Sequence, residues 1–225
     1  MIFQNGWFPV GVVMAAWPVL LVIFALCAKQ AWVSVSQHRS AFLVAAVMLP
    51  LAWSLNVSPE SGQLAGMSYH LLALNLTALM LGTSAAFCLG VLLFFPYLWL
   101  WGDWHMFPIN ALSVLLPPLL MNLGFRHWVS RLPANIFIFI FLNGFWAAAV
   151  GMVFTGVILV GLLDWADVFD TAVLWKTAFP VFFLIAWAEA FLSGISTAIF
   201  IALKPQWICT FDDDRYLKSA PKIWQ

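Results

Sequence analysis

Two short segments of the sequence carry side chains that could bind a transition metal. Met67 and His70 precede a long apolar run, and Asp103 and His105 follow another one. Imidazole suits Ni, Cu, Co and Zn, whereas the thioether of methionine favours Cu(I). With Met1 at the N-terminus, these residues define a candidate metal site: His70, His105, Asp103, Met67 and Met1. The alternative is that both histidines are interfacial residues that bind water or backbone carbonyl groups.

Two further polar residues lie within or beside apolar runs. Glu189 lies deep in the last run, where an ionisable group is costly and is a functional candidate. Its alternative role is structural, as a carboxyl group bonded to a neighbouring helix. Asn110 follows Asp103 and His105 closely enough to be a member of the same site.

The composition indicates an integral membrane protein. The chain has 225 residues, of which 64% are hydrophobic and only 8% are charged, whereas a soluble domain carries roughly 25% charged residues. The 14 Trp and 21 Phe suit lipid contact and interfacial belts. A formal net charge of zero argues against a nucleic-acid partner. The absence of phosphate-loop, HExxH and GxSxG motifs argues against an enzyme.

Seven apolar runs predict the fold. They cover about Trp7–Ala28, Ala41–Val57, Tyr69–Gly82, Ala85–Trp101, Phe107–Phe125, Asn135–Leu163 and Ala178–Leu203. The third and fourth runs together are too long for one span of roughly 20 residues, so Gly82-Thr83-Ser84 predicts a tight turn between two helices. We therefore expect an all-α, polytopic protein with about seven transmembrane helices. Residues 1–203 would form one transmembrane domain, and residues 204–225 a cytoplasmic tail.

The positions of the basic residues support seven spans over six. Seven spans place eight of the nine Lys and Arg residues on one side of the membrane: Lys29, Arg39, Arg126, Arg131, Lys204, Arg215, Lys218 and Lys222. By the positive-inside rule this side is cytoplasmic, so the N-terminus is outside and the C-terminus inside. The segments with His70 and His105 then share the outer side. The expected location is the bacterial cytoplasmic (inner) membrane.

Four segments, in order along nearly the whole chain, resemble one family. They are MIFQNGWFP, SYHLLALNLTALMLG, WGDWHMFPINAL and AEAFLSGISTAIFIALKPQWI. They resemble the CbiM/NikM-type permeases, the substrate-specific components of energy-coupling factor (ECF) cobalt and nickel importers. The matching positions are Gly6, Phe8, His70, Gly102, Asp103, Asn110 and Glu189. Seven spans and an outer N-terminus also agree with that family.

The resemblance implies capture of a divalent transition metal. In the family the metal is held by the N-terminal amine, the adjacent backbone, a histidine at position 2 and the histidine that matches His70. Here position 2 is Ile2, which cannot bind a metal, and Trp104 replaces a family glycine. A divergent site could instead use His105, Met67 or Met106, and could then favour copper.

The resemblance also implies partners. A chain without an ATPase motif would need an ECF transmembrane coupling subunit and ATPase subunits, with Ni, Co or Cu as substrate and no organic cofactor. The alternative is a non-transport membrane protein that assembles with, stabilises or metallates a membrane metalloenzyme or another membrane complex. Membrane lipid is a partner under both hypotheses.

Overall fold

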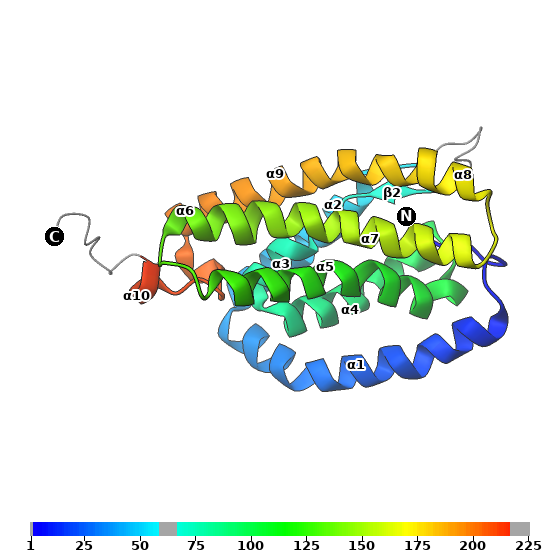
Figure 1. Cartoon of the computed structure of the whole chain (residues 1–225). Coiled ribbons are helices and arrows are strands. Elements are labelled where there is room, and N and C mark those ends of the chain that lie inside the picture. Colours follow the sequence, from blue (N-terminus) through cyan, green and yellow to red (C-terminus); the bar gives the residue numbers. More distant parts are fainter. Residues whose placement is uncertain (1, 59–66, 217–225) are drawn as a thin grey trace.

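The apolar runs form long helices that lie side by side in one bundle (Figure 1). The computed structural model describes residues 2–58 and 67–216. The main helices are α1 (Val10–Gln37), α2 (Arg39–Ser54), α3 (Leu74–Leu81), α4 (Thr83–Trp101), α5 (Phe107–Val129), α7 (Ala147–Trp165) and α9 (Phe179–Leu203). Shorter elements are strands β1 (Asn56–Val57) and β2 (Tyr69–His70), α-helical turns α6 (Ile136–Ile138), α8 (Thr171–Val173) and α10 (Asp213–Tyr216), π-helical segments η2 (Phe139–Trp146) and η3 (Leu174–Ala178), and 3-10 turns η1 (Trp104–Met106) and η4 (Pro205–Trp207).

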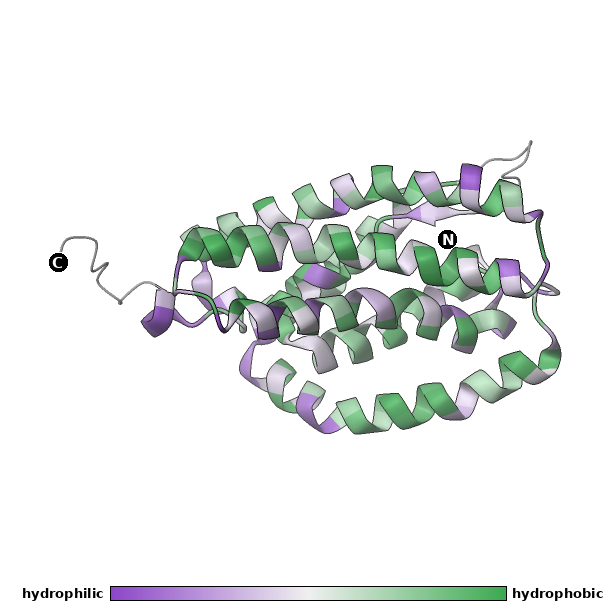
Figure 2. Cartoon of the chain, viewed as in Figure 1, coloured by the Kyte–Doolittle hydropathy of each residue, from purple (hydrophilic) through white to green (hydrophobic). Residues whose placement is uncertain are grey.

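The predicted class, an all-α polytopic membrane protein, is confirmed. Among the described residues, five helical stretches are long and apolar enough to cross a membrane, and the 16-residue helix α2 is shorter. Figure 2 shows hydrophobic residues along most of the outer helices and hydrophilic residues gathered toward their ends. The number of spans and the side of each terminus stay predictions.

The third apolar run differs most from its predicted form. Tyr69 and His70 are extended and pair with β1 in an antiparallel ladder, so that His70 lies opposite Asn56. Helix α3 begins only at Leu74, and all eight of its residues are buried. The predicted turn after it is present, because Gly82 ends α3 with φ 80° and ψ 157°, a conformation open mainly to glycine. The segment is therefore a buried half-helix that follows an extended lead.

Among the other boundaries, two differ most from the predicted runs. Helix α1 continues to Gln37, nine residues beyond the predicted end at Ala28. The last helical stretch begins at Thr171, seven residues before the predicted start at Ala178, because Asp170 accepts bonds from the amides of Ala172 (2.8 Å) and Val173 (3.3 Å). A side chain that caps free amides in this way starts a helix.

The connecting segments gather at two ends of the bundle. The N-terminal segment, β2 and α8 lie at one end, and α10 lies at the other (Figure 1). At the first end, the rings of Trp7 and Phe169 meet at 5.2 Å between centroids. At the second end, Arg215 donates from Nη2 to the carbonyl oxygens of Ser130 (2.8 Å) and Leu132 (3.2 Å).

Candidate metal site

His70 is buried and has one unused ring nitrogen. Its side chain is 2% exposed, and its ring centroid lies 5.9 Å from that of Tyr97. Nδ1 lies 3.0 Å from the carbonyl oxygen of Leu71. Because a carbonyl oxygen can only accept, Nδ1 carries the proton and Nε2 has a free lone pair. Nε2 has no hydrogen-bond partner among the described residues. A neutral imidazole held in this way is suited to bind a metal through Nε2.

Glu189 on α9 holds the turn between His70 and α3. Its Oε1 accepts the amides of Leu72 and Ala73, the latter at 2.9 Å, and Oε2 lies 3.2 Å from the Ala73 amide. Trp53 donates from its indole nitrogen to the carbonyl oxygen of Leu72 at 3.1 Å. The bonds of Glu189 support the structural alternative for this residue, because its carboxylate neutralises free amides at the start of a helix.

Asn110 clamps the N-terminal segment in an equally specific way. Its Oδ1 accepts the Phe3 amide at 2.7 Å, and its Nδ2 donates to the Phe3 carbonyl oxygen at 3.0 Å. Both residues are fully buried. Ile2 is also buried and lies beside Gly102. Asn110 therefore fixes the backbone of the N-terminal segment next to the loop that contains Asp103.

A polar cleft connects these segments. It has a volume of about 420 Å³ and is lined by Ile2, Phe3, Gln4, Asn5, Ser58, Ser68, Gly102 and Asp103. The structure thus brings Asp103 together with the N-terminal segment and the start of β2. Met1 lies outside the described residues.

Asp103 and His105 bind each other at the surface. Oδ1 of Asp103 lies 2.9 Å from both the amide and the Nδ1 of His105. The His105 side chain is 59% exposed, and its ring lies tilted by 33° against that of Trp104 with centroids 3.9 Å apart. Met67, in contrast, is fully buried, and its sulfur accepts a bond from the Tyr69 hydroxyl at 3.6 Å.

The candidate residues thus lie in separate environments. Within residues 2–58 and 67–216, no three His, Cys, Asp or Glu side chains are grouped so as to hold a metal ion. His70 is buried in the protein, while Asp103 and His105 are bonded to each other. Three residues that position this region were not among the candidates, namely Phe3, Trp53 and Tyr97. Trp53 could have been considered, because a buried indole N–H usually needs an acceptor.

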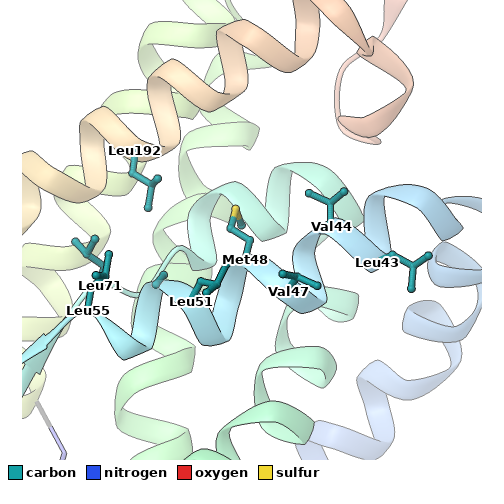
Figure 3. A pocket seen from close by; sticks show the side chains of 9 residues that line it. Leu43, Val44, Val47, Met48, Leu51, Leu55, Leu71 and Leu192 are labelled. Atoms are coloured by element: carbon teal, nitrogen blue, oxygen red, sulfur yellow. The ribbon is translucent and has the colours of Figure 1, made fainter.

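An apolar groove beside α2 has no nitrogen or oxygen side-chain ligand for a metal, and the thioether of Met48 is its one sulfur. It has a volume of about 610 Å³, and Figure 3 shows Leu43, Val47 and Leu51 of α2 facing it, with Leu71 and Leu192 from neighbouring segments. Every lining residue is apolar. The groove belongs to the hydrophobic surface of the bundle and not to the polar cleft.

Known proteins confirm the resemblance seen in the sequence. Two solved structures share the fold. One is a transition metal transporter with 14% sequence identity and a TM-score of 0.76, and the match covers 90% of this chain and 93% of that chain. The other is a truncated transition metal transporter with 15% identity and a TM-score of 0.75, and the match covers 91% of this chain and 99% of that chain. A search of curated proteins found no match. The model of the CbiM family, described as the cobalt uptake substrate-specific transmembrane region, matches residues 3–207. The chain is therefore a member of the CbiM family, a transport component and not an enzyme.

Proposed function

We propose that this protein is the membrane component that captures a divalent transition metal for an ECF-type importer in the bacterial cytoplasmic membrane. The observation that carries the proposal is the buried His70, whose Nε2 has no partner within residues 2–58 and 67–216, while Glu189 and Trp53 hold the adjacent turn. Family membership and the likeness to metal transporters support it. In this proposal His70 is the first metal ligand.

The remaining ligands are proposed at the same end of the bundle. Ile2 supplies no ligating side chain, so the N-terminal backbone is a better source, because Asn110 holds it beside the polar cleft. Asp103, His105 and Met67 are further candidates, together with Met1. Nitrogen and carboxylate ligands favour Ni or Co, while use of a thioether favours Cu(I).

The energy for uptake would come from other subunits. The sequence has no nucleotide-binding motif, so the proposal requires a transmembrane coupling subunit and ATPase subunits. Residues 1–203 would form the membrane domain, with the 204–225 tail in the cytoplasm. The metal would enter at the outer end near His70, and ATP hydrolysis in the partner subunits would drive its release inward.

Metal analysis of the purified protein tests the proposal directly. After anaerobic loading with Ni, Co or Cu in separate samples, we expect about one metal ion per chain. The His70→Ala variant should bind at least about 100-fold more weakly, since even residues outside the ligand shell can cost 10–100-fold. His127→Ala is the matched control, because His127 lies on the exposed surface near the far end of α5.

Two outcomes would count against this function. If the wild-type protein binds no stoichiometric metal, the capture role is wrong, and a role in assembling another membrane complex becomes the better hypothesis. If His70→Ala retains the same affinity as the wild type, the metal is held by a different ligand set, and His70 loses its proposed role.

A further inference from the structure

A second group of buried polar side chains surrounds α3. We call Asn75, Asn122, Asn143, Ser193 and Thr197 the asparagine cluster. Nδ2 of Asn75 donates to the carbonyl oxygen of Asn143 (2.9 Å) and to Oγ of Ser193 (2.8 Å). Oδ1 of Asn75 accepts from Nδ2 of Asn122 at 2.8 Å. The cluster thus joins four elements that are separate in the sequence: α3, α5, η2 and α9.

Three oxygen atoms of this cluster are unused. Oδ1 of Asn122, Oδ1 of Asn143 and Oγ1 of Thr197 have no partner within the described part of the chain. Their side chains are 0%, 2% and 0% exposed, respectively. A buried polar atom without a partner is unfavourable, and most such atoms in proteins are bonded to protein or to ordered water. Three of them in one cluster indicate a ligand that donates hydrogen bonds or carries positive charge.

The backbone of two elements packs closely beside the hydroxyl of Thr197. Asn143 lies in the π-helical segment η2, and π-helical turns are frequent at functional sites. The next residue, Gly144, has no side chain, and a Cβ atom there would lie 3.3 Å from Oγ1 of Thr197 and 3.3 Å from the Cα of Gly194. The two glycines allow η2 and α9 to approach closely beside Oγ1 of Thr197.

The cluster also has a route to solvent. Asn143 lines a cleft of about 340 Å³ together with Arg126, Thr210, Asp212 and Arg215. This cleft is at the end of the bundle that carries α10. Asn122 is seven residues before the end of α5, which corresponds to about 10 Å along a helix. Asn143 is the member of the cluster that reaches this cleft.

The charge of the cluster decides which ligand it suits. Its five side chains are neutral, so a cation there would lose its hydration without gaining a countercharge. Water carries no such cost and needs only two to four polar partners. We propose that the asparagine cluster binds water that enters from the α10 end, as a hydrated inner vestibule. Ala73, whose amide is bonded to Glu189, is two residues from Asn75, so the Glu189-held turn separates this water from His70.

An isosteric substitution tests whether the Thr197 hydroxyl is hydrated. If Oγ1 bonds to water, Thr197→Val removes that bond, and the Tm of the purified protein should fall or stay unchanged. If the site is dry, the same substitution removes an unsatisfied oxygen and should raise the Tm, which would overturn the proposal. Thr155→Val is the control, because Thr155 is equally buried and its hydroxyl bonds to the Gly151 carbonyl oxygen at 2.7 Å.

Thiol labelling tests the route to solvent. In a background with Cys27, Cys88 and Cys209 replaced by serine, a small charged methanethiosulfonate should modify Thr197→Cys at least tenfold faster than Thr155→Cys. Equal rates would overturn the vestibule. A rate for Thr197→Cys that falls when sodium chloride replaces choline chloride would mean that a cation occupies the cluster, which would also overturn the assignment to water.

Discussion

The two candidate histidines, at the end of the bundle that carries the N-terminal segment, are positioned in opposite ways. His70 is 2% exposed, and the turn that follows it is bonded to Glu189, 116 residues away from Ala73 along the chain. His105 is 59% exposed, and its hydrogen bonds go to Asp103, two residues away. One histidine therefore depends on the tertiary structure, and the other on a local turn.

This difference suggests separate roles for the two segments. A buried histidine with one nitrogen bonded and the other free is held in a single orientation, which favours tight metal binding. An exposed histidine paired with a carboxylate can rotate and exchange with water, and such surface pairs contribute about 0–1 kcal/mol. We infer that the His70 segment provides affinity, whereas the His105 segment has at most a secondary part in first contact with the metal.

The largest effect is expected from Glu189. Glu189→Ala leaves the amides of Leu72 and Ala73 buried without an acceptor, at about 1–3 kcal/mol each. We expect a loss of about 2–5 kcal/mol in the free energy of unfolding, a lower Tm in detergent, and a large loss of bound metal because His70 is displaced. Thermal unfolding and metal analysis on the same preparation measure both.

Glu189→Gln is the control that separates hydrogen bonding from charge. Its amide oxygen can still accept from Leu72 and Ala73, so most of the stability and metal binding should remain. If Glu189→Gln loses metal as completely as Glu189→Ala while keeping the wild-type Tm, the carboxylate has a direct role toward the metal, and the structural assignment of Glu189 is wrong.

Asn110 should have an intermediate effect. Asn110→Leu fills a similar volume but breaks both bonds to Phe3, which leaves a buried amide and a buried carbonyl group without partners. We expect metal binding to weaken about 10–100-fold, as for other residues that position a ligand, while the Tm falls by less than in Glu189→Ala because the N-terminal segment can detach.

Asn122→Leu serves as the comparison for Asn110→Leu. It removes another buried asparagine of the same helix, but at the opposite end and away from Phe3. Equal metal affinity for Asn110→Leu and the wild type would show that the N-terminal backbone is not part of the site.

Most of the fold could be predicted because its determinants are local. Long apolar runs identify helices, and the glycine at position 82 identifies the turn between α3 and α4. The extended lead before α3 could not be predicted in this way. Tyr69 to Leu81 reads as one apolar run, but Glu189 and Trp53 bond to Leu72 and Ala73, and the helix begins after them at Leu74.

The site was predictable only in part, for the same reason. His70, Asn110 and Glu189 stand out as polar residues in or beside apolar runs, and each of them proves to have specific buried contacts. Their partners are backbone groups of residues far away in the sequence, such as Phe3. Backbone groups carry no sequence signal, so neither the clamp on the N-terminal segment nor the turn beside His70 could be foreseen.

The smallest effect is expected at the exposed pair. Asp103→Asn removes the negative charge beside His105 but keeps an accepting oxygen, whereas His105→Ala removes the imidazole ring. Each should change the free energy of unfolding by less than about 1 kcal/mol. If His70 provides the affinity, the equilibrium metal affinity of both variants should change less than threefold. The rate of metal capture at low ionic strength should fall by a larger factor than the affinity in Asp103→Asn, because a carboxylate at the mouth of the cleft attracts cations. Stopped-flow capture and equilibrium titration distinguish the two quantities. A loss of equilibrium affinity in His105→Ala as large as that in His70→Ala would make the two histidines equal ligands, and the contrast between the two segments would then be wrong.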